Sequence, residues 1–162
     1  MEHNVRRFYF MPLMINLAIP MVFGAIATFV ALRAPSEWAK NMGIWELIPD
    51  WIGLSQVRIG IRIFIGFAAY LVWLRRKEIP FYSKVIVAYF LSPCLSVTWA
   101  FFFFRMHWTS VSFVFIALAV LVLVYNVYQF YRTSKLSALL MIPYLFWIGF
   151  LGYVNIVVYL RG

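Results

Sequence analysis

The sequence has few of the side chains that most enzymes and metal sites use. Its 162 residues include one cysteine, two histidines and five acidic residues. The lone Cys94 excludes an internal disulfide and a cysteine-rich metal site, and His3 and His107 do not have the spacing of paired metal ligands. No carboxylate lies inside an apolar run, so the sequence provides neither a proton relay nor an acid–base pair. These absences argue against a redox or hydrolytic enzyme and against an ion-coupled pump, and they indicate no required cofactor.

Charge is also scarce, whereas apolar residues are abundant. Charged residues are 12% of the chain and apolar residues 65%, against ~25% and ~45–50% in soluble domains. A soluble protein of this size could not bury so much apolar surface. The net charge of +9 comes from basic residues spread along the chain, which is typical of helix-flanking charge in membrane proteins. We therefore expect the lipid bilayer as the main partner, and no nucleic acid.

Five apolar segments follow one another, at residues 8–32, 52–74, 85–104, 111–131 and 136–160. About 20 residues are needed for a helix to cross the bilayer, and continuous rather than alternating runs favour helices over a barrel. The sequence thus predicts an all-α integral membrane protein, a single five-helix transmembrane domain over residues 1–162. The loop at 33–51 is long and the other connectors are short, so we expect consecutive helices to be antiparallel neighbours.

The distribution of Lys and Arg predicts the orientation. Eight lie on the side of the N-terminus: Arg6, Arg7, Arg75, Arg76, Lys77, Lys84, Arg132 and Lys135. The other side has Arg33, Lys40, Arg105 and Arg161, and also Arg58 and Arg62 if these face that way. Because positive loops stay in the cytoplasm, this bias favours a cytoplasmic N-terminus.

Motifs in the C-terminal half are specific. The run at 143–150, Pro-Tyr-Leu-Phe-Trp-Ile-Gly-Phe, is followed by Asn155, and a Ser-Lys-Leu-Ser-Ala-Leu-Leu run at 134–140 precedes it. With Tyr89, Trp99 and Phe103–Phe104 upstream, this pattern resembles the TspO/MBR family of tryptophan-rich sensory and translocator proteins. Pro49-Asp50-Trp51 is similar to the Pro-x-Trp of that family's first loop.

The resemblance implies a five-helix membrane receptor or carrier for a planar apolar ligand, porphyrin- or haem-like first and sterol-like second. It also implies a homodimer, in a bacterial inner membrane rather than a mitochondrial outer membrane. The sequence departs from the family at pocket positions: Ser92 and Ser96 replace Gln and Asn, and Phe146 and Leu151 replace small residues. These departures leave open a structural or accessory subunit of a membrane complex, with its pocket filled. A third reading, breakdown of a tetrapyrrole, has no acid–base set to support it.

A candidate ligand site follows from the aromatic residues of the third and fifth helices. An aromatic slot between these helices would suit a flat apolar ligand, although such a stripe also serves helix packing. Trp99 and Trp147 are predicted as stacking walls, and Trp51 as part of a lid formed by the 33–51 loop. The predicted lining residues are Leu118, Leu151 and Val154.

Arg58 and Arg62 are four residues apart and share one face of the second helix. They could snorkel or pair with Asp50 or Glu46 of the long loop. Alternatively, they are the candidate anion contacts of the site and would clamp a group such as a propionate.

Three amides in the apolar segments are predicted as structural residues. We expect Asn155 and Asn16 to bond to neighbouring helices and Asn126 to lie at the membrane interface. Two pairs of small residues would allow helices to approach closely: Gly149 with Gly152, and Gly66 with Ala69.

Overall fold

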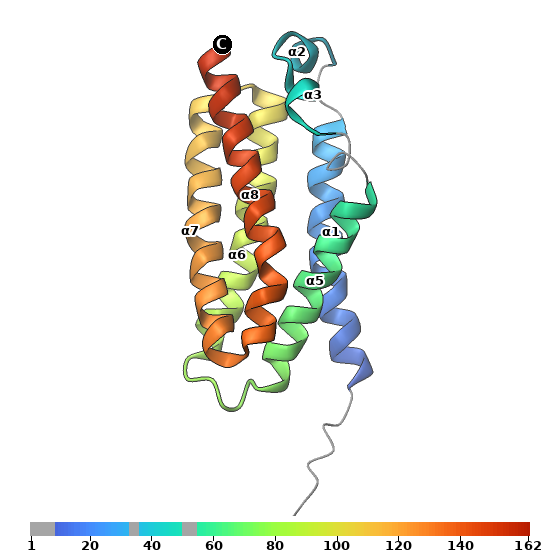
Figure 1. Ribbon diagram of the computed structural model, residues 1–162, viewed down its shortest axis with the longest axis vertical. Helices are drawn as coiled ribbons and strands as arrows, with labels where there is room; N and C mark the ends of the chain where they lie inside the picture. Colours follow the sequence, from blue (N-terminus) through green and yellow to red (C-terminus); the bar gives the residue numbers. More distant parts are fainter. Residues whose placement is uncertain (1–8, 33–35, 50–54) are drawn as a thin grey trace, which may run out of the picture.

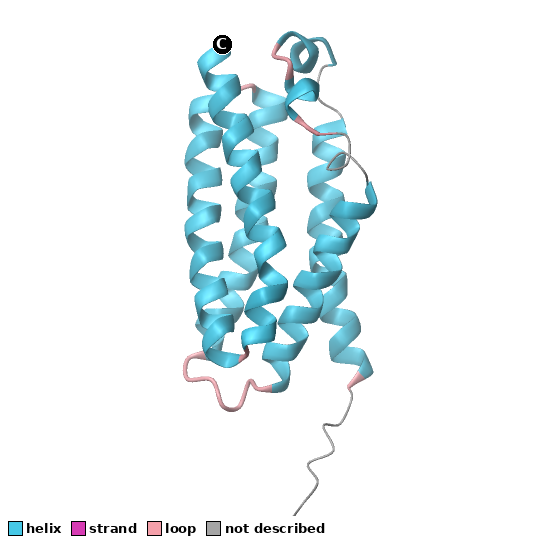
Figure 2. Cartoon of the chain, viewed as in Figure 1, coloured by secondary structure: helices cyan, strands magenta, loops and turns pink. Residues whose placement is uncertain are grey.

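A computed structural model describes residues 9–32, 36–49 and 55–162, and every regular element within them is a helix (Figure 2). Five helices are long and apolar enough to cross a membrane. They are α1 (Phe10–Leu32), α5 (Ser55–Leu74), α6 (Tyr82–Phe101) with its π-helical extension η1 (Phe102–Met106), α7 (Thr109–Thr133) and α8 (Lys135–Arg161). The predicted five-helix membrane fold is confirmed.

The helix ends differ from the predicted runs by a few residues. The third span begins at Tyr82 rather than Val85 and continues through η1 to Met106. The prediction ended each run at a charged residue, and such residues mark the membrane boundary rather than the end of the helix. Lys84 and Arg105 therefore lie on the terminal turns of the span.

The five long helices form a ring in the order α1, α5, α8, α7, α6 and back to α1 (Figure 1). Consecutive helices are neighbours at α6–α7 and α7–α8, as expected. The expectation is wrong for α5 and α6, which do not pack closely although a short connector joins them. Residues 75–81 are enough to cross the end of the bundle, so α8 and α1 take the places beside α5.

A glycine lets α1 and α5 approach closely. A Cβ on Gly66 would lie 2.7 Å from Leu17 Cα and 2.8 Å from the Asn16 carbonyl oxygen, both backbone atoms of α1. This small-residue site therefore serves packing inside the chain. A Cβ on Gly149, by contrast, would meet nothing within 4 Å.

Asn155 ties three helices together, as predicted. Its Oδ1 accepts hydrogen bonds from Trp99 Nε1 of α6 at 2.8 Å and from Ser112 Oγ of α7 at 2.7 Å. Its Nδ2 donates to the Thr109 carbonyl at 3.0 Å. The Asn16 side-chain amide instead donates at 2.8 Å to the Pro12 carbonyl, one turn back in its own helix. Its bond to a neighbouring helix runs through the backbone carbonyl, which accepts from the Tyr89 hydroxyl of α6 at 3.5 Å.

The long first loop folds onto the end of the bundle that holds the C-terminus (Figure 1). It contains the short helices α2 (Ser36–Asn41) and α3 (Ile44–Leu47). Trp38 stacks on His107 at 4.3 Å between ring centroids and packs edge-on against Phe103 at 5.6 Å. Arg161 Nη1 donates to the Met42 carbonyl at 2.8 Å. These contacts hold the two short helices against α8 and the α6–α7 turn.

Candidate ligand cavity

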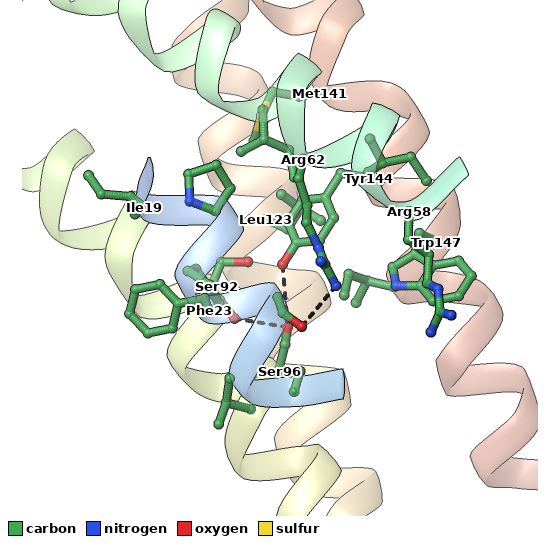
Figure 3. Close-up of a pocket in the computed structure, with 18 of the residues that line it drawn as sticks. Ile19, Phe23, Arg58, Arg62, Ser92, Ser96, Leu123, Met141, Tyr144 and Trp147 are labelled. Carbon is green, nitrogen blue, oxygen red and sulfur yellow. Dashed lines mark hydrogen bonds between the residues drawn. The ribbon is translucent and has the colours of Figure 1, made fainter. Parts of the chain in front are cut away.

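A cavity of about 110 Å³ lies inside the helix ring, and all five long helices contribute residues to its lining (Figure 3). Along α8 the lining runs from Met141 to Leu151, which at ~1.5 Å per residue is ~15 Å. The cavity is therefore narrow and elongated along the bundle axis.

One end of the cavity is aromatic, and Arg58 lies beside Trp147 there (Figure 3). Trp99, Trp147 and Leu151 line this end together with Ala27 of α1. Trp99 is held in place by its bond to Asn155 and by stacking on Phe103, with centroids 5.2 Å apart. Such a fixed indole gives a flat wall against which an apolar group can pack.

Arg62 brings a positive charge into the middle of the cavity. Its Nη2 donates to the Gly24 carbonyl at 2.8 Å and to Thr28 Oγ1 at 3.2 Å, both on α1 (Figure 3). Arg62 can reach α1 in this way only because residue 24 is a glycine, since a Cβ there would overlap the guanidinium group. Glu46, one of the two predicted carboxylate partners, forms no ion pair with Arg62, and Asp50 lies outside the described residues. Arg58, one turn away, also lines the cavity.

Hydroxyl groups line the wall at the level of Arg62. The Tyr144 hydroxyl and Ser96 Oγ are 3.5 Å apart, and Ser96 Oγ donates to the Ser92 carbonyl at 3.0 Å. Figure 3 shows Tyr144, Ser96 and Arg62 in this central region. The cavity thus combines an aromatic end, which also contains Arg58, with a polar, positively charged middle.

Asn126 lies near the opposite end, with Met141 and Tyr89. It was expected at the membrane interface, but it is fully buried, with 0% of its side chain exposed. Neither amide atom has a hydrogen-bond partner among the described residues, and neither does Ser92 Oγ. A buried polar group without a partner costs about 1–3 kcal/mol. Sequence reasoning missed this residue, whose only signal was an amide inside an apolar run.

The structure brings together five of the eight predicted site residues around the cavity: Trp99, Trp147, Leu151, Arg58 and Arg62. Val154 is buried, but it lies about a turn beyond the lining. Leu118 was wrongly placed in the lining, because its side chain is 42% exposed on the outer face of α7. Trp51 lies outside the described residues.

The alternative in which Phe146 and Leu151 fill the pocket does not match the positions of these side chains. Phe146 is 75% exposed and points away from the helix ring, so it does not occupy the cavity. Leu151 lines the cavity and leaves space in it.

The described lining contains no Asp, Glu, His or Lys residue. Among the described residues, no group of three or more His, Cys, Asp or Glu side chains could hold a metal ion. The chemistry that these groups offer a ligand is hydrogen bonding, charge pairing and apolar contact.

A search of curated proteins finds no match to this chain. The sequence model of the TspO/MBR family matches residues 16–160, which include all five membrane-spanning helices in whole or in large part. The fold, the cavity within the ring and this match together show that the chain belongs to the TspO/MBR family.

Proposed function

We propose that this protein is a TspO-like membrane receptor or carrier whose cavity takes an apolar ligand with an acidic group. The observation that carries the proposal is Arg62, a cation inside an apolar bundle whose only partners among the described residues are a carbonyl and a hydroxyl. An arginine in the membrane interior costs about 2.5–3.5 kcal/mol. A ligand carboxylate would offset that cost with charge-assisted hydrogen bonds.

The rest of the cavity supports an apolar ligand body. Trp99, Trp147 and Leu151 form one end, where ring stacking and burial would supply the affinity. A porphyrin- or haem-like ligand comes first in this proposal and a sterol-like ligand second. In the same proposal the 33–51 loop, with Trp51, acts as the lid.

The size of the cavity restricts which ligands could bind without movement of the helices. Its volume of about 110 Å³ is below the ~300–1,000 Å³ of typical ligand pockets. A slim aromatic acid would require less widening of this cavity than a tetrapyrrole, for which α1 and α5 would have to move away from α6 and α8.

Purified protein titrated with protoporphyrin IX, and separately with 4-phenylbutyrate, tests the proposal. We expect saturable binding of at least one acid, followed by tryptophan quenching for the porphyrin and by calorimetry for phenylbutyrate. Trp147→Leu should abolish the quenching. Arg62→Gln should weaken binding by roughly 10- to 100-fold, the equivalent of a hydrogen bond to a charged group at about 1.5–3 kcal/mol.

Two glycine variants separate the role of the arginine from damage to the fold. Gly24→Ala should displace the Arg62 side chain and weaken binding as Arg62→Gln does. Gly60→Ala is the matched control, because a Cβ there meets nothing within 4 Å. Binding of neither acid by the wild-type protein, or equal affinities in all variants, would refute the proposed function.

A further inference from the structure

The bundle contains two fully buried asparagines with opposite hydrogen-bonding states. Asn155 uses both ends of its amide in bonds to α6 and α7. Asn126 is equally buried, yet neither its Nδ2 nor its Oδ1 has a partner among the described residues. More than about nine in ten buried polar groups in proteins are hydrogen-bonded, so Asn126 calls for a partner that the described residues do not supply.

Asn126 shares its end of the cavity with a second unpaired group. Ser92, from α6, is 1% exposed and lines the same cavity, and its Oγ forms no close hydrogen bond although the Tyr144 hydroxyl lies near it. Two helices thus direct three unpaired polar atoms toward one region.

The position of this pair relative to Arg62 follows from the helix geometry. Helices α7 and α8 are joined by Ser134 alone, so Asn126 lies level with Met141 and Ile142 of α8. Tyr144, at the level of Arg62, is about one turn further along, or ~5 Å at ~1.5 Å per residue. Arg58 lies one more turn of α5 away. Asn126 therefore lies beyond the arginines, toward the Met141 end, and Ser92 lies between it and the level of Arg62, near the Tyr144 hydroxyl.

We propose that Asn126 and Ser92 form a second subsite, which binds a neutral group at the end of the ligand opposite its acid. This inference rests on the proposed function. The amide of Asn126 has a donor nitrogen and an acceptor oxygen to satisfy, so a hydroxyl or an amide, each of which can both donate and accept, matches it. A carboxylate would satisfy only Nδ2 and leave Oδ1 unpaired.

Entry of such a group requires a small adjustment at this end of the cavity. The unpaired atoms are shielded from contact with a water-sized sphere. Met141 lines the same end, and its unbranched side chain changes rotamer readily. The ligand class is accordingly a slim amphipathic acid with a hydroxyl or amide about 5 to 10 Å from its carboxylate, the axial distance from Asn126 to the levels of Arg62 and Arg58.

Two acids that differ by one hydroxyl test this subsite: 4-phenylbutyrate and 4-(4-hydroxyphenyl)butyrate. Their affinities are measured by calorimetry on the full chain. The wild-type protein should bind the hydroxylated acid about 3- to 10-fold more tightly, as expected for one net hydrogen bond. In an entirely apolar pocket, the added hydroxyl would weaken binding instead.

Asn126→Leu, which keeps the number and branching of the side-chain heavy atoms, should remove this preference, so that the two acids bind the variant with equal affinity. Ser92→Ala is a smaller second variant that should reduce the preference if Asn126→Leu does not fold. Arg62→Gln should weaken both acids equally. Equal binding of the two acids, or a preference that survives both variants, would overturn the subsite, whereas binding of neither acid would refute the proposed function itself.

Discussion

Asn155 and Asn126 show how one residue type takes two roles in this bundle. Asn155 stabilises the packing of α6, α7 and α8, because it accepts from Trp99 and Ser112 and donates to Thr109. Asn126 has no such bonds among the described residues, so its amide does not stabilise the fold of the protein alone. Substitutions at Asn155 and Asn126 should therefore separate effects on the stability of the fold from effects on ligand binding.

Asn155→Leu should lower the free energy of unfolding by about 1–3 kcal/mol, because the indole N–H and the Ser112 hydroxyl would stay buried without an acceptor. Unfolding by titration with SDS in mixed micelles measures the effect. The control is Asn126→Leu, which should leave stability unchanged or raise it, since it removes an unpaired buried amide. Equal destabilisation by both substitutions would contradict the different roles assigned to them.

At the scale of the helices, the α1–α5 pair forms one side of the cavity and depends on close backbone approach. Gly66 of α5 meets the backbone of α1 at Leu17 and Asn16. Arg62, one turn earlier in α5, crosses to α1 at Gly24. Each of the two helices therefore contributes one glycine to their contact, Gly66 from α5 and Gly24 from α1. Gly24 also leaves room for the Arg62 guanidinium group, which is the cation of the cavity.

Gly66→Ala should destabilise the protein by about 1–3 kcal/mol, because its methyl group would meet rigid backbone rather than a side chain that can move. Thermal unfolding in detergent reports the loss. Gly149→Ala in α8 has open space around its Cβ and should be neutral or slightly stabilising, since alanine has the higher helix propensity. No difference between the two variants would argue against close α1–α5 packing.

At the scale of the whole molecule, the two ends of the bundle differ in charge. The end with the 75–81 and α7–α8 connectors has six described basic residues: Arg75, Arg76, Lys77, Lys84, Arg132 and Lys135. The opposite end, with α2, α3 and the C-terminus (Figure 1), has Lys40, Arg105 and Arg161. This asymmetry predicts that the connector end faces the cytoplasm.

Reporter fusions in a bacterial host test this orientation. Alkaline phosphatase fused after Gly162 should be active, and green fluorescent protein at the same point should be dark. The same reporters inserted in the 75–81 connector should give the reverse result. A fluorescent C-terminal fusion would show that the charge bias does not set the orientation.

The membrane-spanning segments and the family could be predicted from the sequence because both depend on local features of the chain. A run of about 20 apolar residues crosses the bilayer whatever its neighbours are, and the 143–150 motif with Asn155 lies within one helix. The same reasoning identified the bonding role of Asn155, since an amide in a lipid-immersed helix needs a partner.

Only the tertiary structure decided which face of each helix lines the cavity. Lipid and protein interior are both apolar, so a membrane helix lacks the polar outer face that reveals the inward side of a helix in water. For this reason Leu118 and Phe146 proved to face outward, whereas Asn126 proved to be buried. The order of the helices around the ring, which brings Arg62 to Gly24 and encloses the cavity, likewise depends on contacts between distant segments that no local pattern records.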